Sequence, residues 1–138
     1  MGKLVRKNHN VSLLMYHFVF VAKYRRLVIT EEVDTVFRDV CLEISKRYEI
    51  RFLEIGTEGD YVHLLIQSVP TYSPTKIVKK IKSITAREIF FQLSSVKKAL
   101  WGGEFWSDGY FVSTVGEHGN TDTVKQYIKN QGKEGKYK

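Results

Sequence analysis

The chain has 138 residues, of which 43% are hydrophobic, 27% are charged and two are proline. This composition is typical of a globular protein and excludes a disordered or low-complexity chain. Lysine and arginine outnumber aspartate and glutamate by 22 to 15, which gives a formal net charge of +7. An excess of this size favours a polyanionic partner such as nucleic acid, although a merely solvated basic surface has the same composition.

The length predicts a single domain over residues 1–138, with a basic N-terminal arm at 1–10 and a loose charged tail at 133–138. Cys41 is the only cysteine, so the chain cannot form an internal disulfide. We see neither a signal peptide nor a long apolar segment. These features predict a cytoplasmic protein.

The first predicted elements are a strand and a helix. The run from Val11 to Arg26 is apolar on both alternating faces and rich in β-branched and aromatic residues, which predicts a long strand covered on both sides. Thr30 then serves as the N-cap of a helix. Its apolar residues recur at helical spacing: Val33, Val36, Phe37, Val40 and Ile44.

Two strands, 50–55 and 61–69, follow around the turn sequence TEGD. A second helix begins with Ser73 as cap and Pro74 at the first helical position. An apolar stripe on this helix faces the core: Ile77, Val78, Ile81, Ile84 and Ile89. The opposite side is mainly cationic.

A fourth strand is predicted at 110–116, and a last helix runs from about Asn120 to the stop at Gly132. The order is strand, helix, strand, strand, helix, strand, helix. It predicts an α+β fold: a ferredoxin-like, RRM-like βαββαβ antiparallel sheet with an additional C-terminal helix.

The third predicted strand carries two residues capable of chemistry. Side chains two apart in a strand share a face, so Tyr61 and His63 lie on one side with Leu65 and Gln67. A lone strand histidine is more often a hydrogen-bonded structural residue than a metal ligand. The pattern alone leaves both interpretations open.

The last predicted helix places Tyr127 and Gln131 four residues apart, on one face beside the apolar stripe. Tyr127 is either a residue at the edge of the core or a nucleophile beside an amide oxygen that can ligate a hard cation.

Five sequence blocks in order carry a resemblance that covers nearly the whole chain: YHFVFVAKYRR, GDYVHLLIQSVP, KSITAREIF, LWGGEFWSDGYFVSTVG and VKQYIKNQ. The chain resembles the single-tyrosine HUH-superfamily transposases of bacterial insertion sequences, in the two-hundred/six-hundred-and-five group (transposase A), and the related repeat-associated tyrosine transposases.

The resemblance implies a metal-dependent enzyme that cleaves and rejoins single-stranded DNA at insertion-sequence ends. Tyr127 would attack a backbone phosphate and form a 5′-phosphotyrosine. Mg²⁺ or Mn²⁺ would be held by the histidine strand and Gln131. The resemblance also implies a homodimer that binds DNA hairpins, in which the tyrosine of one subunit can serve the metal site of the other.

The chain departs from this family at Tyr61, where the family has a second histidine. A neutral phenol is a poor Mg²⁺ ligand. Three interpretations follow. In the first, His63 and Gln131 are enough to bind the metal ion, with Tyr61 as a direct or water-bridged contact. In the second, the Asp60 side chain rotates toward the metal site and replaces the missing ligand, and in the third, the site is inactive and the protein binds DNA without cutting it. We favour the first.

Basic residues supply the predicted contacts to DNA phosphates. One group lies at the end of the first strand and the other on the second helix: Lys23, Arg25, Arg26, Lys76, Lys79, Lys80, Lys82 and Arg87. His118 lies in the loop before the last helix and is a further candidate. Phe105, Trp106 and Tyr110 are candidates for stacking on unpaired bases, with core packing as the alternative.

The rival function is a non-catalytic module that binds single-stranded nucleic acid through a degenerate metal site. RNA-recognition domains share the βαββαβ frame, but this chain lacks their glycine-and-aromatic strand signature.

Overall fold

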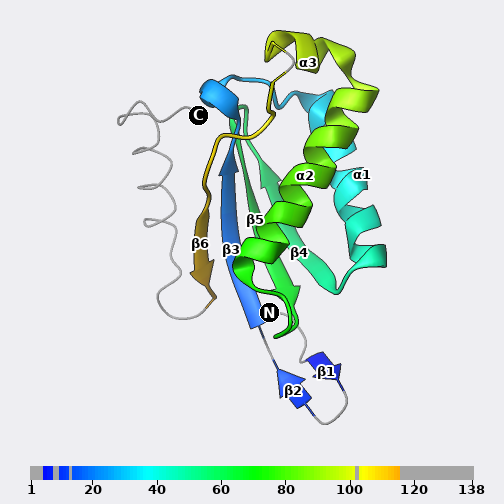
Figure 1. Ribbon diagram of the computed structural model, residues 1–138, viewed down its shortest axis with the longest axis vertical. Helices are drawn as coiled ribbons and strands as arrows, with labels where there is room; N and C mark the ends of the chain where they lie inside the picture. The colour runs from blue at the N-terminus through cyan, green and yellow to red at the C-terminus, as the bar shows by residue number, and fades with distance from the viewer. Residues whose placement is uncertain (1–4, 8–9, 13, 102, 116–138) are drawn as a thin grey trace.

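The structure is a computed structural model that describes residues 5–7, 10–12, 14–101 and 103–115 (Figure 1). The elements that build the main sheet and its cover are, in chain order, β3 (Leu14–Val21), α1 (Glu31–Arg47), β4 (Ile50–Thr57), β5 (Tyr61–Ser68), α2 (Pro74–Gln92) and β6 (Phe111–Thr114). Four short elements accompany them: β1 (Val5–Lys7), β2 (Asn10–Ser12), the 3₁₀ turn η1 (Lys23–Arg25) and α3 (Ser94–Ala99).

The main sheet has the strand order β4-β5-β3-β6, and every neighbouring pair is antiparallel. The first and third strands of the βαββαβ unit therefore lie at its centre. This topology confirms the predicted ferredoxin-like fold. The predicted tyrosine-bearing C-terminal helix lies outside the described residues.

Both helices begin where the sequence predicts. The Thr30 side chain accepts a hydrogen bond from the backbone N–H of Val33 at 3.3 Å, and the Ser73 side chain accepts one from that of Lys76 at 3.1 Å. Each cap satisfies a backbone donor that the first helical turn leaves free.

Helices α1 and α2 lie side by side on one face of the sheet (Figure 1). The buried core between these layers takes alternate residues from the two central strands and the predicted apolar stripes of the helices. Its fully buried side chains include Phe18, Phe20, Val62, Leu64, Ile66, Phe37, Ile44, Ile77, Ile81 and Ile89. Strand alternation thus assigns one face of β3 and β5 to folding.

The first strand is shorter than predicted. It ends at Val21, because the chain then enters the η1 turn, in which Tyr24 and Arg25 have φ values of 58° and 51°. Left-handed backbone cannot continue a strand. Before the start of β3, the short strands β1 and β2 pair antiparallel. The sequence predicted a basic arm at residues 1–10 and no strands there.

Helix α3 was also not predicted, and β6 covers only the middle of the strand predicted at 110–116. Over the described part of the chain, no helix is both long and apolar enough to span a membrane.

Candidate functional site

The two faces of β5 have different surroundings, as the sequence predicts. Val62, Leu64 and Ile66 are fully buried beneath the helices, whereas Tyr61, His63 and Leu65 are half-buried on the other face. Gln67, the last residue of that row, is buried. Tyr61 and His63 are thus brought to the same side of the sheet, away from α1 and α2.

The imidazole of His63 lies directly over the backbone of Gly56. These two residues are cross-strand partners of β5 and β4. A Cβ atom built on Gly56 would stand 1.9 Å from Nε2 of His63 and 2.3 Å from Cε1. Since real Cβ atoms do not approach other atoms so closely, the ring occupies space that only a glycine leaves open.

Gly56 is a residue of the site that the sequence patterns did not predict, although a signal was present. A glycine inside a strand often marks a close approach of another group to the backbone, and Gly56 lies one residue before the end of β4. Its position opposite His63 follows from the hairpin register counted back from the β4–β5 turn, in which Thr57 pairs with Val62 and Gly56 with His63. The irregularity between Phe52 and Glu54 lies further from the turn and does not change this pair.

His17 and Glu54 lie on either side of Leu65, as its partners in β3 and β4. Burial lowers the pKa of His17; Glu54 opposes this shift, and the nearby His63 adds to it. His17 shares its strand face with the buried Met15, Val19 and Val21, as expected, but is itself only half-buried. The described residues contain no group of three histidine, cysteine or acidic side chains arranged to hold a metal ion.

Tyr61 has a neutral phenol at physiological pH. Burial raises its pKa above the ordinary value of about 10, and the carboxylates of Glu58 and Asp60 raise it further, against the opposing effect of Arg25. A protonated phenol donates a hydrogen bond and is a weak metal ligand. This chemistry suits a contact to a water or a phosphate oxygen better than direct ligation.

Asp60 is engaged elsewhere. Its carboxylate accepts a hydrogen bond from Nε of Arg25 at 2.8 Å and lies 2.8 Å from the Nη2 atom of the same guanidinium. This ion pair joins the β4–β5 turn to η1 and disfavours the interpretation in which Asp60 rotates in as a substitute ligand. It also occupies one side of Arg25, a predicted phosphate contact.

Tyr127, Gln131 and His118 lie outside the described residues. Their assignments stay predictions.

The predicted phosphate contacts on α2 differ in exposure and in their contacts with rings. Lys76, Lys79 and Arg87 are exposed, whereas Lys80 is half-buried. The Nζ atom of Lys80 lies 4.2 Å from the ring centroid of Tyr48, and that of Lys76 lies 5.0 Å from the ring centroid of Tyr72; both are cation–π contacts. The three exposed cations are accessible to DNA phosphates.

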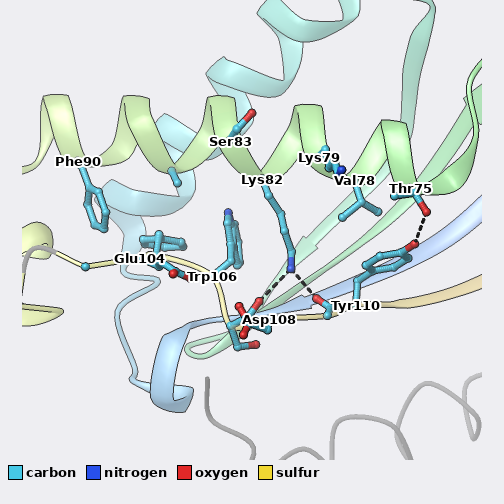
Figure 2. A pocket seen from close by; sticks show the side chains of 15 residues that line it. Thr75, Val78, Lys79, Lys82, Ser83, Phe90, Glu104, Trp106, Asp108 and Tyr110 are labelled. Carbon is cyan, nitrogen blue, oxygen red and sulfur yellow. Dashed lines mark hydrogen bonds between the residues drawn. The ribbon is translucent and has the colours of Figure 1, made fainter.

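Lys82 reaches across from α2 to the loop that precedes β6 (Figure 2). Its ammonium donates hydrogen bonds to the carbonyl oxygens of Ser107, at 2.9 Å, and Gly109. Burial lowers its pKa to about 8, although Asp108 and Glu104 act in the opposite direction. The loop position therefore depends on this lysine.

A pocket of about 590 Å³ lies between α2 and the same loop (Figure 2). Its walls combine rings and aliphatic groups, among them Val78, Phe90, Trp106 and Tyr110, with charged residues of both signs: Lys79, Lys82, Glu104 and Asp108. The Tyr110 hydroxyl lies 3.1 Å from Oγ1 of Thr75, which closes one end. The pocket opens on the helical side of the sheet.

The aromatic residues proposed for stacking are mostly core residues. Phe105 and Trp106 are buried, and Nε1 of Trp106 donates a hydrogen bond to Oγ1 of Thr85 at 3.1 Å. Trp101 is the opposite case, since 88% of its surface is exposed. The glycines that follow it in the sequence were the available signal that this tryptophan belongs to a loop.

Comparison with known proteins places these features in a family. The family model described as "Transposase IS200 like" matches residues 10–131. The ISDra2 transposase TnpA of Deinococcus radiodurans is 31% identical over 121 residues, which are 88% of this chain and 86% of that protein. The transposase for insertion sequence element IS200 of Salmonella typhimurium has the same identity, over 88% of this chain and 78% of its own.

Solved structures agree. A crystal structure of a protein assigned as a transposase from D. radiodurans R1 matches with a TM-score of 0.84 and 32% identity, over 92% of this chain and 97% of that one. A tyrosine transposase associated with REP sequences, solved bound to a REP hairpin, shares the fold, with a TM-score of 0.53 and 11% identity over 98% and 75% of the two chains. The chain belongs to the IS200-like transposase family, and its activity is that of an enzyme of DNA recombination.

Proposed function

We propose that this transposase cleaves and rejoins single-stranded DNA at insertion-sequence ends through a 5′-phosphotyrosine, with a divalent metal ion. The observation that carries the proposal is the position of His63. Its ring is fixed over Gly56 on the sheet face opposite α1 and α2, in a chain that matches the transposase family from residue 10 to 131.

Tyr127 is the proposed nucleophile. Its phenol oxygen attacks the scissile phosphorus, the bond from phosphorus to the 3′ oxygen breaks, and that oxygen takes a proton to become a free hydroxyl. Attack by a 3′ hydroxyl on the phosphotyrosine reverses the step and releases the phenol. Because the covalent bond stores the cleaved link, rejoining needs no external energy source.

His63 and Gln131 would hold Mg²⁺ or Mn²⁺. Of these two, His63 lies in the described part of the chain, and a small set of protein ligands is compatible with Mg²⁺ because this ion keeps several waters and takes phosphate oxygens. The neutral phenol of Tyr61, two residues from His63 on the same face, would donate a hydrogen bond to a bound water or phosphate oxygen. When bound, the ion would neutralise charge on the reacting phosphate.

DNA hairpins are the proposed recognition element. The neighbour solved with a REP hairpin supports this, together with the exposed Lys76, Lys79 and Arg87 of α2. We assign the hairpin to the helical side and the cleaved strand to the His63 side. A homodimer, with active sites shared between subunits, belongs to the same proposal.

The test is an end-labelling experiment. A single-stranded oligonucleotide that spans an element end carries its label at either the 5′ or the 3′ terminus, and the products are separated on a denaturing gel with Mn²⁺ present. The 3′-labelled fragment is expected to stay attached to the protein and the 5′-labelled fragment to be released. Tyr127→Phe is expected to form no adduct and still bind the hairpin. An adduct in Tyr127→Phe, or the opposite polarity, contradicts the proposal.

One observation favours the second candidate, a DNA-binding protein without cleavage activity. A tyrosine, Tyr61, stands at the position where the resemblance implies a second histidine, and its neutral phenol is a poor metal ligand. That candidate predicts hairpin binding with no adduct in any metal, and an affinity for the scissile strand that chelator leaves unchanged.

A further inference from the structure

Two exposed aromatic rings meet at the end of the sheet where β5 begins. Tyr24 and Trp101 are 52% and 88% exposed, and with Arg26 they line a cavity of about 340 Å³. Trp101 follows α3, and Tyr24 lies in η1. We refer to these three residues as the aromatic corner.

The corner is attached to the β4–β5 turn. The N–H of Ala22 donates to the carbonyl of Asp60 at 2.8 Å, and the Arg25 side chain pairs with the Asp60 carboxylate. Asp60 immediately precedes Tyr61, and His63 lies two residues further along. A strand of DNA that passes over Tyr61 and His63 therefore reaches the corner at this end of the sheet.

The backbone of the corner is unusual. The non-glycine residues with positive φ in the described chain are Tyr24, Arg25 and Trp101, at 58°, 51° and 56°. Side chains with a Cβ disfavour this conformation, and residues held in it concentrate at binding sites. Here it occurs at both aromatic residues of the corner.

Cations lie beside the aromatic corner. Arg26, which lines the cavity, is exposed, and so are Lys97 and Lys98 in the last turn of α3, shortly before Trp101 in the chain. The Lys23 ammonium lies 5.6 Å from the ring centroid of Tyr24 and 3.3 Å from a carboxylate oxygen of Glu104. Aromatic rings stack on unpaired bases, and neighbouring cations contact the phosphates. Bases inside a duplex are already stacked on each other and offer no free face to a side chain.

We propose that the aromatic corner stacks an unpaired base of the single-stranded DNA that flanks the cleaved phosphate. The proposal rests on the proposed function, because it assigns the cleaved strand to the His63 side. It adds a subsite of stated chemistry: Tyr24 and Trp101 contact the base, and Arg26 contacts a neighbouring phosphate. The hairpin, on the helical side, does not use this subsite.

Tryptophan fluorescence tests the proposal without cleavage. The chain has two tryptophans, Trp101 exposed and Trp106 buried, so quenching by stacking reports on Trp101. Tyr127→Phe protein in chelator is titrated with the isolated hairpin, with the single-stranded flank, and with flanks carrying one abasic position each. We expect the flank to quench the signal and the hairpin to leave it nearly unchanged. One abasic position is expected to abolish quenching and weaken binding by about 5- to 100-fold.

Variants complete the test. Trp101→Ala is expected to weaken flank binding by a similar factor of about 5- to 100-fold, Trp101→Phe by less, and both to keep the affinity for the hairpin. Phe91→Ala is the matched control, because it removes an equally exposed ring, 82% exposed, from α2. Its flank affinity is expected to be unchanged.

Two results would contradict the assignment of this subsite. In the first, Trp101→Ala binds the flank as wild type does and instead alters the oligomeric state in sedimentation, so that the corner is a protein contact. In the second, the hairpin alone quenches Trp101. Because these titrations need no adduct, loss of the subsite and failure of the cleavage chemistry are separate results.

Discussion

The two faces of β5 are built from alternate residues and differ in burial. On the helical face, Leu64 is fully buried, and its side chain serves packing. On the other face, its neighbour His63 is half-buried and rests on a glycine. The two-residue period of this strand therefore separates core residues from the residue to which we assign the proposed chemistry.

The largest expected effect separates the faces directly. Leu64→Ala is expected to lower the free energy of unfolding by about 2–5 kcal/mol, because it leaves a cavity beneath the helices. His63→Ala is expected to change it by no more than about 0.5 kcal/mol and to abolish the DNA adduct. Urea unfolding and the adduct gel measure the two quantities. Comparable destabilisation by both variants would show that the faces are not independent.

Gly56→Ala tests the His63 side of the sheet alone. The added methyl group would occupy the space of the His63 ring, so the imidazole must move. Displacement of a reacting group by about 1 Å costs on the order of 100-fold in rate, and we expect adduct formation to fall by about that factor.

Gly59→Ala is the matched control in the adjoining turn. There the added methyl group would meet only the Cδ2 end of the exposed Leu27 side chain, at 2.9 Å, which can move aside. Equal activity of the two alanine variants would contradict the role of Gly56 as a positioning residue.

Tyr61→His is expected to strengthen the proposed metal site. An imidazole replaces a neutral phenol whose pKa burial raises further. We expect the apparent Mn²⁺ affinity to rise at least about tenfold, because residues that only orient metal ligands already change affinity by about 10- to 100-fold. Broadening of histidine ring signals in NMR spectra during a Mn²⁺ titration measures the affinity without cleavage. A variant with unchanged affinity would mean that the metal lies elsewhere.

A pH-dependent effect is expected from Lys82 on the helical side. Its pKa is about 8 in the folded chain and about 10.4 in an unfolded one. Between these values the unfolded state binds more protons, so this group makes the free energy of unfolding rise with pH over about pH 8 to 10. Lys82→Met is expected to remove that rise in urea unfolding, and Lys79→Met, which changes an exposed lysine, to keep it. A rise that persists in Lys82→Met would assign it to another group.

Most of the fold was predictable because its signals are local. The caps at Thr30 and Ser73 and the apolar stripes of both helices depend on residues close together in the sequence, and all are confirmed. Tertiary contacts explain the differences. The end of β3 at Val21 depends on a left-handed turn that is attached to Asp60 through Ala22 and Arg25. The hydrophobic periodicity of the sequence does not indicate this turn.

The site was predictable in part for the same reason. The alternation of β5 assigns Tyr61 and His63 to one face from sequence alone. The role of Gly56 requires the register between two strands, and the contrast between Trp101 and Trp106 requires knowing which loop folds over the core. Lys82 and Lys79 look alike in the sequence, yet one supports a loop and the other is exposed.

The most direct test of the central claim, that the His63 face performs the chemistry, is a metal titration of adduct formation. Wild type and His63→Ala are incubated with a single-stranded element end in increasing Mn²⁺, and hairpin affinity is measured on the same samples. We predict a metal-dependent adduct in wild type, none in His63→Ala, and equal hairpin binding by both. A metal-dependent adduct of similar yield in His63→Ala would contradict the claim.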